Sequence, residues 1–193
     1  MIHVDELEGA GIENNPVDRC YLCKKYMFTK VKELAHSLGI STILEGTNAD
    51  DLKQYRPGIK AIQELGLHSP LLEANMTKKE IRELAADYDL KAANKPSSPC
   101  LATRFPYHTL LNYEEMRKVE KIEDYLHACG FYNVRARIHN DLVRLEIDQD
   151  AFMKCMDYRQ EIVLFIKELG YDYVTLDLEG FRSGSQDIKL EEK

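Results

Sequence analysis

KPSSPCLATRFPY, at residues 95–107, separates a half of the chain with helical patterns from a half rich in strand patterns. The stretch contains three prolines, Pro96, Pro99 and Pro106. Each proline removes a backbone donor and pushes the preceding residue toward extended geometry, so an irregular loop is expected. The loop carries Cys100, with Arg104 four residues later. Nearby positive charge favours the nucleophilic thiolate, whereas a buried structural cysteine is the alternative interpretation.

Composition is that of an ordinary globular protein. The 193 residues are 44% hydrophobic and 31% charged, which suits one large or two small domains. The formal net charge of −7 argues against a large nucleic-acid surface. The longest run of aliphatic and aromatic residues, 162–166, is too short to cross a membrane, and the start lacks a signal-peptide pattern. The chain has five cysteines, and this odd count favours reduced thiols, metal ligands or catalytic residues over a disulfide framework. The cytoplasm is therefore the expected compartment.

Helix and strand patterns alternate in the first half. Helices are expected at 20–38, 59–65 and 78–88, and strands at 40–44 and 68–73. The last of these helices follows Thr77 and Glu80, which have capping-box spacing. Alternation of this kind predicts an α/β domain with a parallel sheet. Two strands make a poor domain, so we expect that the chain begins partway into a larger domain; strands supplied by a partner are the alternative.

The second half has an αββαβ pattern. Helices are expected at 113–129 and 151–169, and strands at 133–138, 142–147 and 173–178. The first two strands are joined by His139-Asn140-Asp141, which predicts a hairpin. This order predicts a small α+β domain with an antiparallel sheet. The expected division is therefore 1–108, 109–180 and a flexible tail at 181–193.

Three cysteines fall outside the apolar patterns. Cys20 and Cys23 form a CxxC pair at the start of a helix, and Cys100 lies in the proline-rich loop. Three thiolates hold a metal ion or a cluster while leaving one coordination position open for chemistry. A redox or incidental pair is an equally good interpretation of the CxxC.

A polar loop follows the first expected strand. It contains Thr47, Asn48, Asp50 and Asp51, at the strand end where α/β sheets place ligands. Its backbone amides and carboxylates would suit a nucleotide with Mg²⁺, and a polar turn is the alternative. The sequence contains no glycine-rich phosphate loop of the GxxxxGK[ST] type.

Charged residues with alternating spacing lie on the expected hairpin. Arg135 and Arg137 share one strand face, and paired guanidinium groups suit a phosphate or a carboxylate. Arg104 would extend such an anion pocket, and Glu123 would balance its charge. The hairpin also carries Arg144 and Glu146. A solvated charged face is the alternative.

Six motifs together carry a resemblance to a known family: DRCYLCK, LEGTNADD, YRPG, KPSSPCLATRFPY, RARIHNDLVRLEI and VTLDLEGFRSGS. With these motifs the whole chain resembles the LarE family, ATP-dependent (sacrificial) sulfur transferases that build the nickel-pincer nucleotide of lactate racemase. Members begin with a PP-loop domain, of the adenine nucleotide alpha hydrolase-like fold, that carries an SGGxDS-type pyrophosphate loop. That loop is missing here, so the resemblance implies an incomplete PP-loop domain followed by the α+β domain. ATP use by this chain alone is therefore not expected.

The resemblance implies a reaction. ATP adenylates a carboxylate of pyridinium-3,5-biscarboxylic acid mononucleotide, a sulfur nucleophile displaces AMP, and a thiocarboxylate results. Cys100 matches the sulfur-donating cysteine, and members that also carry the Cys20 and Cys23 pair hold a 4Fe–4S cluster on the three thiols. Pro99 and Thr103 depart from the small residues and the serine that are frequent at their positions.

The resemblance also implies binding residues. Arg104, Arg135 and Arg137 match phosphate-binding positions, and Glu123 and Glu146 match acidic pocket positions. Asp50 and Asp51 match positions near the nucleotide. Family members form homo-oligomers, so a homo-oligomer with a nucleotide substrate is expected. The alternatives are a PP-loop enzyme of tRNA thiolation, against which the acidic charge counts, and a non-catalytic cluster-binding or oligomerisation fragment.

Overall fold

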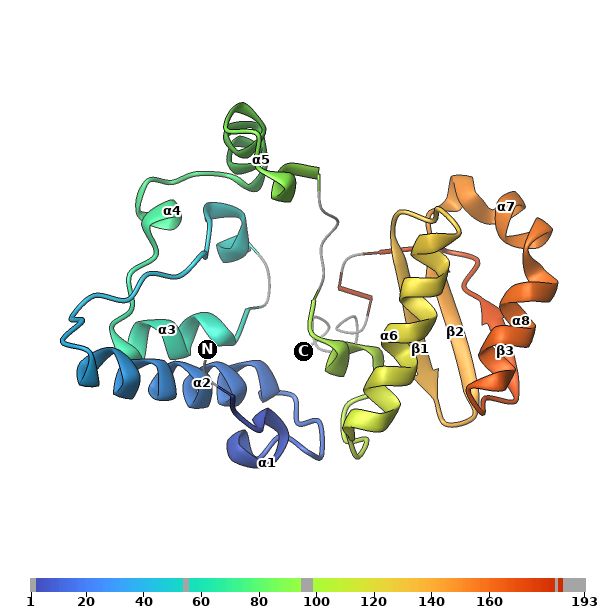
Figure 1. Cartoon of the computed structure of the whole chain (residues 1–193), viewed down its shortest axis with the longest axis horizontal. Coiled ribbons are helices and arrows are strands. Elements are labelled where there is room, and N and C mark those ends of the chain that lie inside the picture. The colour runs from blue at the N-terminus through green and yellow to red at the C-terminus, as the bar shows by residue number, and fades with distance from the viewer. Residues whose placement is uncertain (1–2, 54–55, 95–98, 183, 186–193) are drawn as a thin grey trace. The chain divides into compact units, whose positions relative to one another are not determined.

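The computed structural model describes residues 3–53, 56–94, 99–182 and 184–185. The chain is α/β and divides into two compact units, Met1–Lys95 and Pro96–Lys193 (Figure 1). Residues 99–108 therefore group with the second unit, whereas the sequence pattern assigned them to the first domain. Residues 95–98 of the proline-rich stretch lie outside the described residues.

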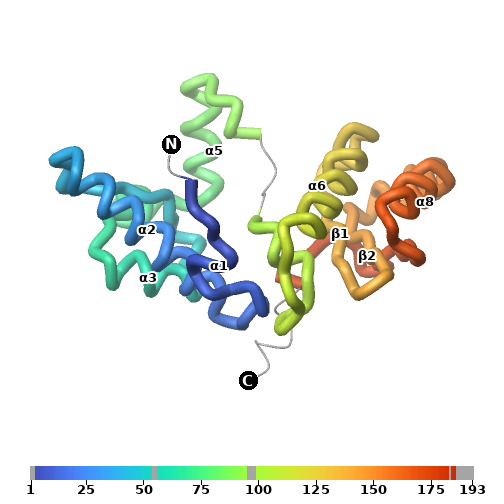
Figure 2. Tube along the Cα trace, turned by 60° about the horizontal axis from the view of Figure 1, so that its bottom comes forward, coloured from blue at the N-terminus to red at the C-terminus, as the bar shows by residue number. Residues whose placement is uncertain are grey.

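Helices make up most of the first unit. They are α1 (Glu6–Ala10), α2 (Arg19–Ser37), α3 (Gly58–Leu65), α4 (Pro70–Glu73) and α5 (Lys78–Asp87), with 3₁₀ turns η1 (Ala49–Lys53) and η2 (Lys91–Asn94). The expected helices at 20–38, 59–65 and 78–88 are confirmed to within one or two residues. Helices α2 and α3 lie side by side in both views (Figures 1 and 2). Ala35 of α2 and Ala61 and Ile62 of α3 are buried.

The two strands expected in this unit are largely wrong. Among its described residues, strand pairing is limited to one parallel bridge between Leu44 and His68. Glu45 N donates to His68 O at 2.9 Å, and His68 N donates to Ile43 O at 3.1 Å. The expected strand at 68–73 instead becomes α4, because Pro70 stands at the first helical position, where its fixed φ favours a helix start. The parallel direction of the bridge agrees with the expected sheet.

The capping box at the start of α5 is confirmed. Thr77 Oγ1 accepts from Glu80 N at 3.3 Å, and Glu80 Oε2 accepts from Thr77 N at 2.8 Å. We expect Thr77→Ala to destabilise α5 by about 1 kcal/mol, because it removes the acceptor for an unpaired helix N–H. Faster amide hydrogen exchange in the first turn of α5 would measure this loss. Thr77→Ser should exchange like the unsubstituted chain, and equal exchange in Thr77→Ala would contradict the role of the cap.

A three-stranded mixed sheet organises the second unit. Its elements are η3 (Leu101–Arg104), α6 (Tyr113–Ala128), β1 (Val134–His139), β2 (Leu142–Ile147), η4 (Gln149–Ala151), α7 (Phe152–Asp157), α8 (Arg159–Glu168) and β3 (Tyr173–Leu176). The strand order is β1-β2-β3. The expected hairpin is confirmed, with β1 antiparallel to β2 and Arg135 opposite Glu146.

The antiparallel sheet expected here is wrong at its last strand, since β3 runs parallel to β2. A crossover through α7 and α8 separates the two strands, and helical crossovers are the connections that parallel strands require. The single helix expected at 151–169 is also wrong. It breaks at Tyr158, whose φ of −89° and ψ of 7° are not helical, although neither glycine nor proline marks that position.

The core of the second unit lies between α6 and the sheet. Val119, Ile122 and Leu126 of α6 are at most 1% exposed. Both views show α6 lying along β1 (Figures 1 and 2). The central strand β2 buries Val143, Leu145 and Ile147. This packing fixes α6 and β1 against each other and so positions the charged residues that they carry.

The chain continues along the sheet after β3. Asp177 N donates to Leu145 O at 2.9 Å, and Phe181 N donates to Ile147 O at 2.7 Å. The expected flexible tail therefore begins with residues that contact β2. Residue 183 and residues 186–193 of that tail lie outside the described residues. No helix among the described residues is both long enough and apolar enough to cross a membrane.

Candidate active site

Five charged residues that the sequence singled out lie together in the second unit. They form the arginine–glutamate cluster, which consists of Arg104, Glu123, Arg135, Arg137 and Glu146. Arg104 ends η3, Glu123 lies on α6, and the other three lie on the hairpin of β1 and β2. All five are at most 7% exposed. The cluster is therefore not the solvated charged face that the sequence left open.

Arg104 and Glu123 form a bidentate ion pair. Arg104 Nε donates to Glu123 Oε1 at 2.7 Å, and its Nη2 donates to Oε2 at 2.8 Å. Ala136 N of β1 also donates to Glu123 Oε1, at 2.9 Å. The pair thus joins η3, α6 and β1. Two parallel charge-assisted hydrogen bonds fix the guanidinium plane as well as its position.

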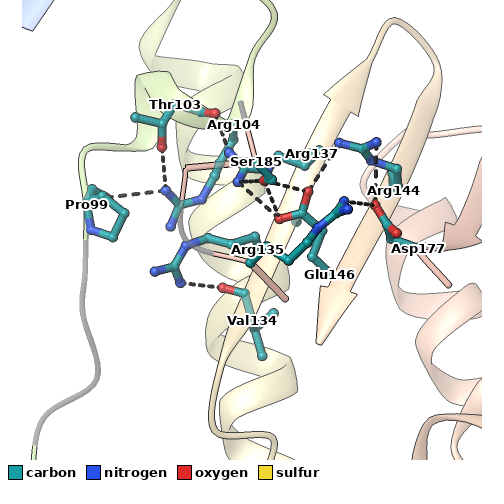
Figure 3. Close-up of polar contacts among 12 residues, drawn as sticks. Pro99, Thr103, Arg104, Val134, Arg135, Arg137, Arg144, Glu146, Asp177 and Ser185 are labelled. Atoms are coloured by element: carbon teal, nitrogen blue, oxygen red, sulfur yellow. Dashed lines mark hydrogen bonds and ion pairs between the residues drawn. The ribbon is translucent and has the colours of Figure 1, made fainter. Parts of the chain in front are cut away.

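Arg137 and Glu146 form the second buried ion pair (Figure 3). Arg137 Nη2 donates to Glu146 Oε2 at 3.0 Å, and Arg144 Nη2 donates to Oε1 at 3.2 Å. Arg144 also forms an ion pair with Asp177, with 3.5 Å between Arg144 Nη1 and Asp177 Oδ2. Glu146 is completely buried and is paired with two guanidinium groups, which compensates its desolvated charge.

Arg135 lies beside these pairs. Its Nη1 donates to Val134 O at 2.5 Å, and its guanidinium lies 5.0 Å from the centre of the Phe181 ring. Burial, followed by the nearby charge of Arg104, lowers the pKa of Arg135 to about 10. Positive charges held close together in a partly dry site favour an anion, because an anion relieves their mutual repulsion.

Cys100 borders this cluster. Its side chain is exposed, which differs from the buried structural cysteine that the sequence left open. Thr103 Oγ1 donates to Cys100 O at 2.8 Å and accepts from Arg104 Nη1 at 2.7 Å. Arg137 Nη1 donates to Thr103 O at 2.6 Å. Two cluster arginines therefore fix the short turn that presents the Cys100 thiol.

The polar loop of the first unit uses its carboxylates to hold its own shape. Asp50 accepts from Lys53 Nζ at 2.8 Å and from Lys78 N, in the first turn of α5, at 2.9 Å. Asp51 accepts from Asn48 N at 3.1 Å and pairs with Arg56. Thr47 is buried and donates through its hydroxyl to Glu45 at 2.7 Å. These contacts are those of a polar turn, and nucleotide binding by the loop stays a prediction.

Cys20 and Cys23 are partly buried near the start of α2. They belong to the first unit, and Cys100 belongs to the second. Among the described residues, no group of three or more His, Cys, Asp or Glu side chains is arranged to hold a metal ion. The three-thiol cluster therefore stays a prediction.

Sequence reasoning missed two polar residues of the site, Thr103 and Ser185. Thr103 links the Cys100 carbonyl to Arg104, and Ser185 contacts both Arg137 and Glu146. Neither residue type has a spacing pattern that marks it as functional. The one available signal was position, since both lie within the motifs KPSSPCLATRFPY and VTLDLEGFRSGS.

No family model matches the chain, but curated relatives do. It is 37% identical to the pyridinium-3,5-bisthiocarboxylic acid mononucleotide synthase of Lactiplantibacillus plantarum over 187 residues, which are 97% of this chain and 68% of that protein. It is 36% identical to an uncharacterized protein of Synechocystis sp. over 186 residues, 95% of this chain and 69% of that protein. It is 32% identical to an uncharacterized protein of Methanocaldococcus jannaschii over 183 residues, 95% of this chain and 69% of that protein. At this identity and coverage, the chain belongs to the LarE family, the enzyme family of pyridinium-3,5-bisthiocarboxylic acid mononucleotide synthase.

Proposed function

We propose that this chain transfers sulfur to a carboxylate of pyridinium-3,5-biscarboxylic acid mononucleotide, giving a thiocarboxylate. The named relative is a synthase of the bisthiocarboxylic acid mononucleotide, so sulfur must enter at the carboxylate positions. The observation that carries the proposal is the exposed Cys100 thiol, whose turn is tied through Thr103 to two buried arginines.

The reaction needs activation before sulfur can enter. A carboxylate resists nucleophilic attack, so its oxygen first attacks the α-phosphorus of ATP and pyrophosphate leaves. A thiolate then attacks the carbonyl carbon of the acyl-adenylate, and AMP leaves with the electron pair of the broken C–O bond. In the sacrificial route the thiolate is Cys100. Its Cα proton is then removed, the Cβ–Sγ bond breaks, and sulfur departs with the product while dehydroalanine remains.

The arginine–glutamate cluster would bind the phosphate of the substrate mononucleotide. Arg104, Arg135 and Arg137 supply guanidinium donors, and such donors suit phosphate oxygens. Glu123 and Glu146 hold Arg104 and Arg137 in place. Binding the phosphate here would set the substrate's carboxylates at a fixed distance from the turn that carries Cys100, and such positioning accounts for a large part of catalysis.

The remaining assignments concern the adenylation half of the reaction and its cofactors. Thr47, Asn48, Asp50 and Asp51 would bind ATP and Mg²⁺ in a PP-loop-like domain of which the first unit forms part. Cys20, Cys23 and Cys100 have the thiolate chemistry that a 4Fe–4S cluster requires. Such a cluster would supply a sulfide for transfer. We further propose a cytoplasmic homo-oligomer that acts on a small nucleotide and binds neither nucleic acid nor membrane.

A preformed acyl-adenylate of the pyridinium dicarboxylate mononucleotide tests the sulfur-transfer half directly, because it bypasses ATP. Incubation with this chain should yield the thiocarboxylate, detected by chromatography and mass spectrometry. In the sacrificial route the protein should also lose the mass of one H₂S for each product formed. Hydrolysis to the dicarboxylate alone, with both freshly reduced and iron–sulfide-reconstituted protein, would contradict the proposed function.

A further inference from the structure

The segment after β3 carries Ser185 back to the arginine–glutamate cluster. Gly180 allows this return: its φ is +72°, and a Cβ at this position would lie 2.9 Å from Ile147 O. Phe181 then hydrogen-bonds to β2 and covers one face of Arg135. A residue with a side chain at position 180 would be both strained and in collision with backbone, so glycine is required.

The Ser185 hydroxyl joins the two members of the Arg137–Glu146 pair (Figure 3). Ser185 Oγ accepts from Arg137 Nη2 at 2.6 Å. It lies 3.0 Å from each carboxylate oxygen of Glu146, to which it donates its single proton. A hydroxyl is suited to this position because it accepts and donates at the same atom.

Arg137 has two N–H groups left for a ligand, one at Nε and one at Nη1. Thr103 O accepts one of the two N–H groups of Nη1, and Glu146 and Ser185 accept the two of Nη2. The Nε atom is buried and has no acceptor within the described part of the chain. A buried N–H without an acceptor is unfavourable, so a phosphate oxygen would be a stabilising partner for it. The direction in which the Nε–H group of Arg137 points depends on the guanidinium plane, and the contacts to Nη1 and Nη2 hold that plane.

We infer that Ser185 is a positioning residue of the mononucleotide site, holding Arg137 so that its Nε donor meets the substrate phosphate. The inference rests on the proposed function. Without the hydroxyl, the guanidinium keeps its contacts to Thr103 O and Glu146, but Nη2 loses one of its two acceptors and the guanidinium plane is held less firmly. Affinity for the phosphate then falls, while contacts with the rest of the nucleotide are unchanged.

Isothermal titration with two ligands tests this role. The first is pyridinium-3,5-biscarboxylic acid mononucleotide, and the second is the corresponding nucleoside, which lacks the phosphate. Ser185→Ala should weaken mononucleotide binding about tenfold, equivalent to about 1.4 kcal/mol, and leave nucleoside binding unchanged. Ser185→Thr, which keeps the hydroxyl, should bind the mononucleotide like the unsubstituted chain. Leu178→Ala is the control on the same segment, because Leu178 is 82% exposed.

The outcomes separate this inference from the proposed function. Equal affinities in Ser185→Ala and the unsubstituted chain, with both preferring the mononucleotide, would overturn the role of Ser185 alone. An unsubstituted chain that does not prefer the mononucleotide over the nucleoside would overturn both. Loss of affinity for both ligands in Ser185→Ala would indicate a merely structural role and also overturn the inference. Gly180→Ala should reproduce the phosphate-specific loss, since it displaces the whole segment.

Discussion

Cys100→Ala is expected to abolish thiocarboxylate formation from the acyl-adenylate, with a fall in rate on the order of 10³-fold or more. The substitution removes the thiol that, in the proposed reaction, lies next to the activated carboxylate. It should leave the fold intact, because the side chain is exposed and the contacts of its turn run through the backbone carbonyl. The measurement is product formed per protein, by mass spectrometry, under anaerobic conditions.

Cys129→Ala is the matched control for loss of a thiol in the same unit, and it should keep full activity. Cys20→Ala separates the two sources of sulfur. If Cys100 gives up its own sulfur, Cys20→Ala should still form one product per protein. If a cluster-bound sulfide is transferred, Cys20→Ala should lose activity together with the visible absorbance of the reconstituted protein. Undiminished product in Cys100→Ala would contradict both routes.

Glu123→Ala is expected to lower the free energy of unfolding of the second unit by about 3–5 kcal/mol. The substitution leaves Arg104, at 1% exposure, without its bidentate partner, and it also removes the acceptor of Ala136 N. Breaking a buried pair from one side is strongly unfavourable, because the remaining charge stays desolvated. Urea unfolding followed by circular dichroism measures the change.

Glu120→Ala is the matched control, since Glu120 lies one turn earlier on α6 and is exposed. It should leave the urea midpoint unchanged. The same small effect in Glu123→Ala would show that the Arg104–Glu123 pair does not hold η3 and β1 to α6. In that case Glu123→Ala should bind the substrate phosphate as well as the unsubstituted chain does. This result would contradict the role of the pair in the proposed site.

Local patterns predicted the elements whose signals are local. The capping box at Thr77 and the hairpin at 139–141 were found because their determinants lie within a few residues of each other. The strand expected at 68–73 failed because a proline at a helix start outweighed a short apolar run. The predicted direction of β3 was wrong for another reason. The direction depends on where α7 and α8 return the chain, and local spacing in the sequence carries no information about that.

In the site, too, local patterns predicted some features, whereas features that depend on tertiary packing were missed. Arg135 and Arg137 were grouped correctly because residues two apart on a strand share a face, and both are in the buried cluster. The Arg104–Glu123 pair could not be derived from spacing alone, since these two residues meet only through the packing of η3 against α6. The sequence predicts a flexible tail at Ser185 and misses its contacts, because they depend on the return of the chain over β2.

A crystal structure of this protein with bound pyridinium-3,5-biscarboxylic acid mononucleotide would show directly whether the substrate binds between the arginines and Cys100. We expect the phosphate within hydrogen-bonding distance of Arg135 and Arg137, with one donor coming from Arg137 Nε. We also expect a substrate carboxylate beside the Cys100 sulfur. A mononucleotide bound away from these arginines, or one whose carboxylates face away from Cys100, would contradict the proposed site.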